Sequence, residues 1–256
     1  MLSIFDHPAF SASLFFPRRD ETPAPDGARD LFVEVARDVR LQVRAHTRPG
    51  TVATLLLFHG NGEYAASYDA FAGDFADAGA DLIVADFRGY GQSTGEPSLR
   101  ACLDDARPVL DAARRAARHP SLFVMGRSLG SACAAELYQD ATNGVAGYVF
   151  ESAPADLYGT LRRRGVSVDK LPEDDLATFC PLRKLRRGTA PALVLHGERD
   201  TLIPPSEAEL TFGALGTRVK ERVLIPGRGH NDVSDHPLYW EALARFITRL
   251  AGRPQG

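Results

Sequence analysis

The sequence is poor in the residues that disulfide frameworks and metal centres require. Its 256 residues include three cysteines, Cys102, Cys133 and Cys180, which are too few and too scattered for a set of structural disulfides. None of them stands near a histidine at the spacing of a metal site, so we expect neither a metal nor another cofactor. Cys133 stands among alanines and is predicted to be a small core residue.

Other absences exclude classes of partner. The formal net charge is −3, which gives no reason to expect nucleic acid or an anionic membrane as a partner. No apolar run approaches the length of a membrane span, and no basic start with an apolar stretch indicates a secretory signal. We therefore expect a cytoplasmic protein. The 44% hydrophobic content is ample for a core, and without repeats or low-complexity linkers we expect one domain over residues 1–256.

Predicted strands and helices alternate along most of the chain. Runs rich in apolar residues predict strands over 54–58, 82–85, 121–125, 145–150, 192–195 and 221–225. Helices are expected over 67–78, 99–118, 131–139, 206–212 and 237–250. Alternating residues over 31–35 and 39–44 predict an antiparallel hairpin. This order predicts an α/β fold with a mostly parallel sheet and helices on both faces.

One connection is unusually long. About 40 residues separate the strand that ends near Glu151 from the strand that begins near Ala192, whereas βα connections usually take a few. Part of this stretch must be helical, and its position places it over the carboxyl ends of the strands, where open α/β sheets bind ligands. We expect a short cap insert at about 152–190. The alternative is a peripheral helical insert without substrate contact.

A serine lies in the turn between a predicted buried strand and a predicted helix. Residues Gly126–Gly130 read G-x-S-x-G with Ser128 at the centre. A turn this tight forces the serine out of the backbone, as a catalytic nucleophile requires. The glycines are steric requirements, because a Cβ at either end would collide with the facing strand or helix. Ser128 is therefore the candidate nucleophile.

A serine nucleophile needs an imidazole base and a carboxylate that orients it. His230 follows the last predicted strand and Asp200 follows the strand before it, so both lie at the same sheet edge as Ser128 and in the order Ser, Asp, His. His230 could instead be a loop histidine, and Asp200 only a turn or cap residue. The rival acids are Glu198 and Asp156. The other candidate bases fit less well by position: His46, His59, His119, His196 and His236.

Two backbone amides are expected to form an oxyanion hole. One belongs to Leu129, which follows the nucleophile at the start of a helix. The other belongs to the loop after strand 54–58, where we choose Asn61 and place Gly62 second. The glycine-rich stretch 86–93 fits neither phosphate-binding pattern, so we interpret it as a structural turn held by Asp86 and Arg88.

The chain resembles the α/β-hydrolase superfamily from about Leu31 to Leu250. The matching segments are His59-Gly60-Asn61-Gly62, residues 86–93, Gly126-Arg127-Ser128-Leu129-Gly130-Ser131, His196-Gly197-Glu198-Arg199-Asp200 and Gly229-His230-Asn231-Asp232. It looks closest to the compact serine-hydrolase branch with depalmitoylase-like and peptidase-related members. The resemblance implies an eight-stranded mixed sheet with one antiparallel strand and a Ser128–Asp200–His230 triad.

The sequence thus predicts a serine hydrolase that cleaves an ester or thioester of a small-to-medium acyl group. Ser128 would attack, His230 would move the proton, Asp200 would orient the imidazole, and the amides of Asn61 and Leu129 would hold the oxyanion. The expected partner is a small-molecule acyl ester or thioester. The alternatives are a serine peptidase with the same machinery and a non-catalytic ligand-binding or signalling protein with the same fold.

Overall fold

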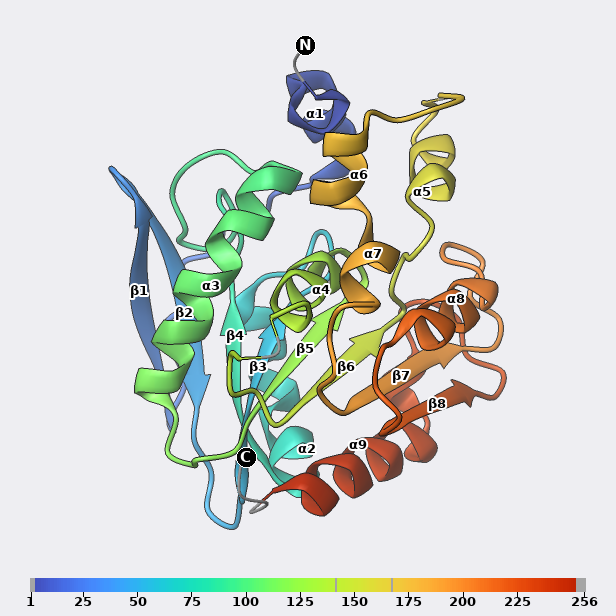
Figure 1. Ribbon diagram of the computed structural model, residues 1–256. Helices are drawn as coiled ribbons and strands as arrows, with labels where there is room; N and C mark the ends of the chain where they lie inside the picture. The colour runs from blue at the N-terminus through green and yellow to red at the C-terminus, as the bar shows by residue number, and fades with distance from the viewer. Residues whose placement is uncertain (1–2, 141, 167, 252–256) are drawn as a thin grey trace.

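An eight-stranded sheet forms the centre of the computed structural model, which describes residues 3–140, 142–166 and 168–251 (Figure 1). Its strand order is β1-β2-β4-β3-β5-β6-β7-β8. The strands are β1 (Ala28–Ala36), β2 (Val39–His46), β3 (Ala53–Phe58), β4 (Ala80–Ala85), β5 (Leu122–Arg127), β6 (Gly147–Glu151), β7 (Ala192–Gly197) and β8 (Lys220–Ile225). Among these strands, β2 is antiparallel to both of its neighbours, β1 and β4, and all other neighbouring pairs are parallel. The predicted mostly parallel sheet with one antiparallel strand is therefore confirmed.

Helices cover both faces of the sheet, as predicted (Figure 1). On one face lie α3 (Leu99–Ala116), α4 (Ser131–Tyr138), α7 (Pro181–Leu185) and α8 (Ser206–Ala214), and on the other lie α2 (Ala72–Asp77) and α9 (Pro237–Leu250). Every residue of β3, β4 and β7 is buried because both faces are covered, which is why these strands are mostly apolar, with Thr54, Asp81 and His196 as polar exceptions. No described helix combines the length and the apolarity that crossing a membrane would require.

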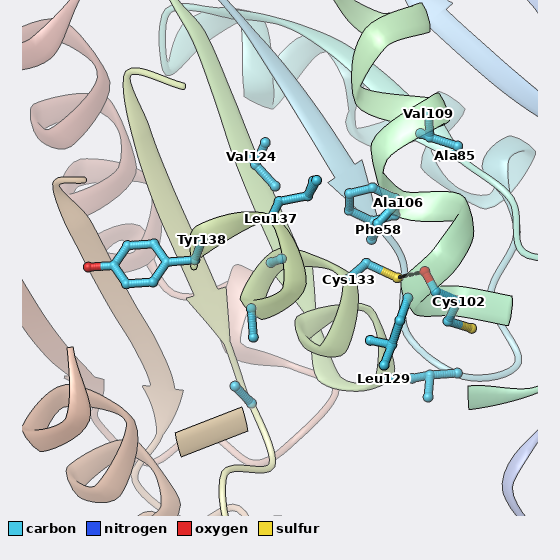
Figure 2. Packing of buried hydrophobic residues seen from close by; sticks show 14 of the residues in the cluster. Phe58, Ala85, Cys102, Ala106, Val109, Val124, Leu129, Cys133, Leu137 and Tyr138 are labelled. Atoms are coloured by element: carbon cyan, nitrogen blue, oxygen red, sulfur yellow. Dashed lines mark hydrogen bonds between the residues drawn. The ribbon is translucent and has the colours of Figure 1, made fainter. Parts of the chain in front are cut away.

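The helix after Ser128 is anchored in the larger of the two core layers. Figure 2 shows Cys133 of α4 beside Cys102 of α3, with the Cys133 thiol donating to the Cys102 carbonyl oxygen at 3.2 Å. Cys133 is 1% exposed, as predicted for a core residue. Leu129 and Phe58 belong to the same cluster. The start of α4 is therefore fixed against the sheet by close packing, which leaves the preceding turn little freedom.

The N-terminal segment differs from the prediction, which assigned it no helix. It forms a 3-10 helix η1 (Ile4–Asp6) and α1 (Pro8–Leu14), with Pro8 in the first turn and the His7 ring accepting from the Ala9 amide at 3.2 Å. Seven residues are too few for helical periodicity to stand out. The Phe5 ring packs against Phe179, with ring centroids 4.5 Å apart. The first residues thus lie beside the insert at 152–190.

Two predicted elements change in detail. The helix predicted over 67–78 is instead a 3-10 helix η2 (Ala65–Phe71) followed by α2. The insert at 152–190 contains α5 (Leu157–Arg163), α6 (Glu173–Phe179) and α7. Figure 1 shows α1, α5 and α6 grouped beyond one end of the central strands, whereas α7 lies lower and packs on α4 and α8. Only the first part of the insert therefore lies over the sheet edge.

The turn between β5 and α4 is strained and tightly enclosed. Ser128 has φ of +49°, in the left-handed region, which costs a residue other than glycine about 1–3 kcal/mol. A Cβ at Gly126 would lie 2.6 Å from the Gly130 carbonyl oxygen, and a Cβ at Gly130 would overlap the Phe58 carbonyl oxygen of β3. Both clashes are with backbone atoms that cannot rotate away. The predicted steric need for glycine at both positions is confirmed.

We expect Gly130→Ala to destabilise the protein by about 3 kcal/mol or more, because the added methyl group must displace the backbone of β3. Chemical denaturation would measure the change in the free energy of unfolding. Gly213→Ala is the matched control, since Gly213 is exposed in α8 and a Cβ there would meet no atom within 4 Å. That variant should be neutral or more stable by up to about 1 kcal/mol. Equal effects of the two substitutions would contradict the steric account.

Candidate active site

Three side chains meet at the carboxyl ends of neighbouring strands. Ser128 follows β5, Asp200 follows β7 and His230 follows β8. The Ser128 Oγ lies 3.0 Å from the His230 Nε2, and the His230 Nδ1 lies 2.7 Å from the Asp200 Oδ2. The carboxylate can only accept, so Nδ1 carries the proton and Nε2 is left to accept from the serine hydroxyl. The arrangement can move a proton from Ser128 to the imidazole.

Asp200 is held in place by more than His230. Its Oδ1 accepts from the amides of Leu202 at 3.0 Å and Ile203 at 2.8 Å, so it also caps this turn. Burial acts to raise the pKa of Asp200, but hydrogen bonds from His196, His230 and the Ile203 amide outweigh it and bring the pKa well below its usual range. The carboxylate is therefore charged at any pH at which the protein would be assayed.

The rival residues are engaged elsewhere. Glu198 accepts from the Gly227 amide at 2.9 Å, and Asp156 stands at the start of α5, where it lies 3.3 Å from Arg162. Within the described part of the chain, neither forms a hydrogen bond with His230. The geometry therefore leaves Asp200 as the acid partner.

Leu129 and Asn61, whose backbone amides were predicted to hold an oxyanion, both border the same cavity as Ser128. Leu129 lies in the single 3-10 turn η3 (Ser128–Gly130), and its amide, like that of Asn61, donates to no group among the described residues. The Asn61 side chain is occupied, because its Oδ1 accepts from the Tyr90 hydroxyl at 2.7 Å and its amide nitrogen donates to the N-terminal segment. The Gly62 amide interacts with the Tyr90 hydroxyl. Of the two residues predicted for this loop, Asn61 keeps its backbone amide free.

Residues 86–93 form a turn in which Asp86 and Arg88, the two residues expected to hold it, bind other residues and not each other. Asp86 accepts from the Ala65 amide at 2.8 Å, and its Oδ1 lies 3.1 Å from the buried His59 Nε2. Arg88 forms a two-fold contact with Asp105 of α3 at 2.7 and 2.8 Å. His59 is thereby committed to the interior of the sheet edge, away from Ser128.

A buried charged cluster behind Ser128 was not predicted. Arg127, the residue before the candidate nucleophile, donates to Glu151 at 2.9 Å and to Glu63. Its remaining nitrogen lies 3.1 Å from the Asn231 Oδ1 and 3.4 Å from the carbonyl oxygen of His230. One guanidinium at the end of β5 thus connects the loop after β3, the last residue of β6 and the loop after β8. Isolated charged residues without periodicity carry no sequence signal for such a cluster.

Neutral groups complete the cluster. The Tyr239 hydroxyl donates to Glu151 at 2.8 Å, and the Tyr68 hydroxyl donates to Glu63 at 2.7 Å. Burial raises the pKa of Glu151 although Arg127 opposes this effect, whereas at Glu63 burial is outweighed by Arg127 and Tyr68, and the pKa is lowered. Two carboxylates share one guanidinium, so losing Arg127 would leave both without a counter-charge.

A largely apolar chamber opens at Ser128. It has a volume of about 370 Å³ and is bounded by the N-terminal segment, by α5 and α6 of the insert, and by the candidate site itself. Its apolar walls are Phe5, Phe10, Leu14, Phe16, Leu99, Leu129, Ala132, Pro154, Leu157, Phe179, Pro181, Leu202 and Ile203. The expected insert thus borders the site, together with a segment whose contribution the sequence did not reveal.

Comparisons with known proteins agree on the family. The sequence profile described as serine aminopeptidase, S33, matches residues 50–167. Alpha/beta hydrolase domain-containing protein 17B of Xenopus tropicalis is 30% identical over 78% of this chain and 68% of its own, and protein bem46 of Schizosaccharomyces pombe is 27% identical over 84% and 73%. An esterase of Pyrococcus furiosus superposes with a TM-score of 0.73 and 18% sequence identity, over 93% of this chain and all of its own. Est1E of Butyrivibrio proteoclasticus, solved with ferulic acid, superposes with a TM-score of 0.70 and 17% sequence identity, over 86% of this chain and 98% of its own.

We expect Arg127→Met to lower the free energy of unfolding by about 3–5 kcal/mol, because it leaves Glu63 and Glu151 buried without their counter-charge. Urea denaturation followed by circular dichroism would measure it. Arg183→Met is the control, since Arg183 pairs with the exposed Glu173 at the surface of the insert. This control should unfold like the wild type. A similar small effect at Arg127 would show that the cluster contributes little to stability.

Proposed function

The chain belongs to the α/β-hydrolase superfamily, and we propose that it is a serine hydrolase that cleaves an ester or thioester of a small-to-medium acyl group. The observation that carries the proposal is the contact of the Ser128 Oγ with the His230 Nε2 at 3.0 Å, backed by Asp200 at 2.7 Å. A hydroxyl in a strained turn, an imidazole in the right tautomer and an ionised carboxylate form the arrangement that activates serine for acyl transfer.

In the first half-reaction, the Ser128 Oγ forms a bond to the acyl carbon while His230 takes its proton. The bond from the acyl carbon to the leaving oxygen or sulfur then breaks, and His230 returns the proton to that atom. Asp200 keeps Nδ1 protonated throughout and stabilises the imidazolium. The negative oxygen of the intermediate would be held by the amides of Leu129 and Asn61, which donate to no other group among the described residues.

In the second half-reaction, water replaces the leaving group. His230 removes a proton from a water molecule, whose oxygen forms a bond to the acyl carbon while the bond to Ser128 Oγ breaks. The proton passes to Ser128, so the enzyme returns to its starting state and the products are an acid and an alcohol or thiol. The apolar chamber supports an acyl substrate, because an alkyl chain buried there leaves water.

A serine peptidase is the second candidate, favoured by the description of the matching profile. An aminopeptidase must hold the free ammonium group of its substrate, and that group calls for a carboxylate in the cavity. The described lining of the chamber contains no Asp or Glu. The chemistry of the walls therefore favours an ester or thioester over an amino-terminal peptide.

The serine role predicts that Ser128→Ala loses at least about 10³ of kcat/KM on short p-nitrophenyl esters. A fluorophosphonate probe should label the wild type stoichiometrically at Ser128 and leave the variant unlabelled, as intact-mass spectrometry would show. Ser131→Ala is the control, because the Ser131 hydroxyl donates to the Gly126 carbonyl and does not reach His230. A serine that is inert to the probe in the folded wild type would favour a ligand-binding protein.

The acid role predicts that Asp200→Asn lowers kcat by about 10³–10⁴, because the amide favours the wrong imidazole tautomer. Steady-state kinetics on the same ester would measure the loss. Glu198→Gln, which changes the rival acid, should keep activity within a few-fold of the wild type. The reverse ranking of the two variants would reassign the acid.

A further inference from the structure

The chamber wall carries positive charge that its own residues do not balance. Three arginines, Arg127, Arg163 and Arg164, line the chamber, and no carboxylate does within the described chain. The first is paired with acids outside the lining, as described above. The second is paired with Glu207 of α8 at 2.9 Å. The third has no such partner.

Of the three chamber arginines, Arg164 is the one without an acidic partner among the described residues. No Asp or Glu among residues 3–140, 142–166 and 168–251 forms an ion pair with it. Its guanidinium donates to the Ser13 carbonyl oxygen at 2.9 Å and lies 6.0 Å from the centre of the Phe16 ring. Burial, and then the charge of Arg163, lower its pKa, yet a guanidinium stays protonated in a protein. A half-buried charge with only a neutral acceptor is costly, which is why it needs an explanation.

The backbone hydrogen bonds account for the position of Arg164, but they do not require a charged side chain there. It ends α5, and the next residue, Gly165, has φ of +74°. The Gly165 amide donates to the Arg162 carbonyl and the Val166 amide to the Leu161 carbonyl, so the turn is fixed by its own hydrogen bonds. A cation is tolerated at a helix C-terminus. The contact with the Ser13 carbonyl oxygen, however, needs only one N–H donor, which a neutral side chain could also supply.

The position of Arg164 along the chamber indicates which part of a substrate it meets. Part of the chamber wall consists of buried rings, with Phe5 wholly buried and Phe179 4% exposed. Arg164 lies beside Phe16, which is 56% exposed and so marks the mouth. An acyl chain attached to Ser128 gains most from the buried rings, because that is where water is excluded. The leaving group then points toward the mouth and Arg164.

We propose that the leaving group of the substrate carries an anionic group, a carboxylate or a phosphate, that pairs with Arg164. The inference rests on the proposed function, because it names the alcohol or thiol side of the ester that Ser128 cleaves. A guanidinium binds either anion through two parallel N–H donors, so the shared chemistry is a compact group with at least two negative oxygens. Thr160, also in the lining, stands one turn of α5 before Arg164.

The test uses two esters of matching shape that differ chiefly in charge, 4-(octanoyloxy)benzoate and 4-(octanoyloxy)benzamide, and compares their rate ratio between the wild type and the Arg164 variants. They share the acyl chain and the shape of the leaving group. We expect the wild type to prefer the carboxylate ester about tenfold in kcat/KM at low salt, and to lose most of that preference at high salt. Arg164→Gln should bring the ratio to about one, and Arg164→Lys should keep part of it. Both esters meet the same folded fraction of enzyme, so the ratio does not depend on how well a variant folds.

Arg162→Gln is the control, because Arg162 stands on the same helix, is 64% exposed and lies outside the chamber lining. It should keep the wild-type ratio. A third ester, 4-(octanoyloxy)phenyl phosphate, distinguishes the two anions. Of the carboxylate and phosphate esters, the one with the higher kcat/KM carries the anion that the enzyme prefers. A wild-type ratio of one, or a ratio that Arg164→Gln leaves unchanged, overturns the inference alone. If the wild type cleaves none of the esters faster than Ser128→Ala, the proposed function fails and takes this inference with it.

Discussion

The guanidinium of Arg127 is the contact on which the arrangement of the candidate site depends. The three strands that carry Ser128, Asp200 and His230 fix where each loop begins, but loops that leave a sheet edge are free to diverge. Arg127 joins the nucleophile turn to Glu63, to Glu151 and to the carbonyl of His230 at once. Because this contact is buried and its acids are further held by tyrosine hydroxyls, moving one loop means breaking several hydrogen bonds together.

The strained turn at Ser128 relies on the same surroundings. A left-handed serine would relax in an isolated peptide, so the fold must supply the energy that holds it there. It does so on one side through β3, whose Phe58 carbonyl leaves no room for a Cβ at Gly130, and on the other through α4, whose Cys133 is buried against α3. The hydroxyl is thereby aimed at His230 before any substrate binds, which lowers the cost of ordering the site during reaction.

Much of this could be predicted from the sequence, and the reason lies in how local the signals are. Buried parallel strands such as β3 are mostly apolar, and the turn around Ser128 has its two glycines within five residues. What escaped prediction depends on contacts between distant residues. The N-terminal helices are too short for periodicity, and their role depends on contacts with distant residues, such as that of Phe5 with Phe179. The charged cluster of Arg127 unites the ends of β5 and β6 with the loops after β3 and β8, and none of these residues is unusual by itself.

The walls of the chamber come from segments that lie far apart in the sequence, the N-terminal segment and the insert at 152–190, and this has a consequence for biosynthesis. Phe5 and Phe10 are synthesised before Phe179 of α6, the ring partner of Phe5, which follows only after β1 to β6 have been made. During that interval the nascent chain carries an unsheltered aromatic segment, the kind of surface to which holdase chaperones bind. The chamber is thus completed only late in translation.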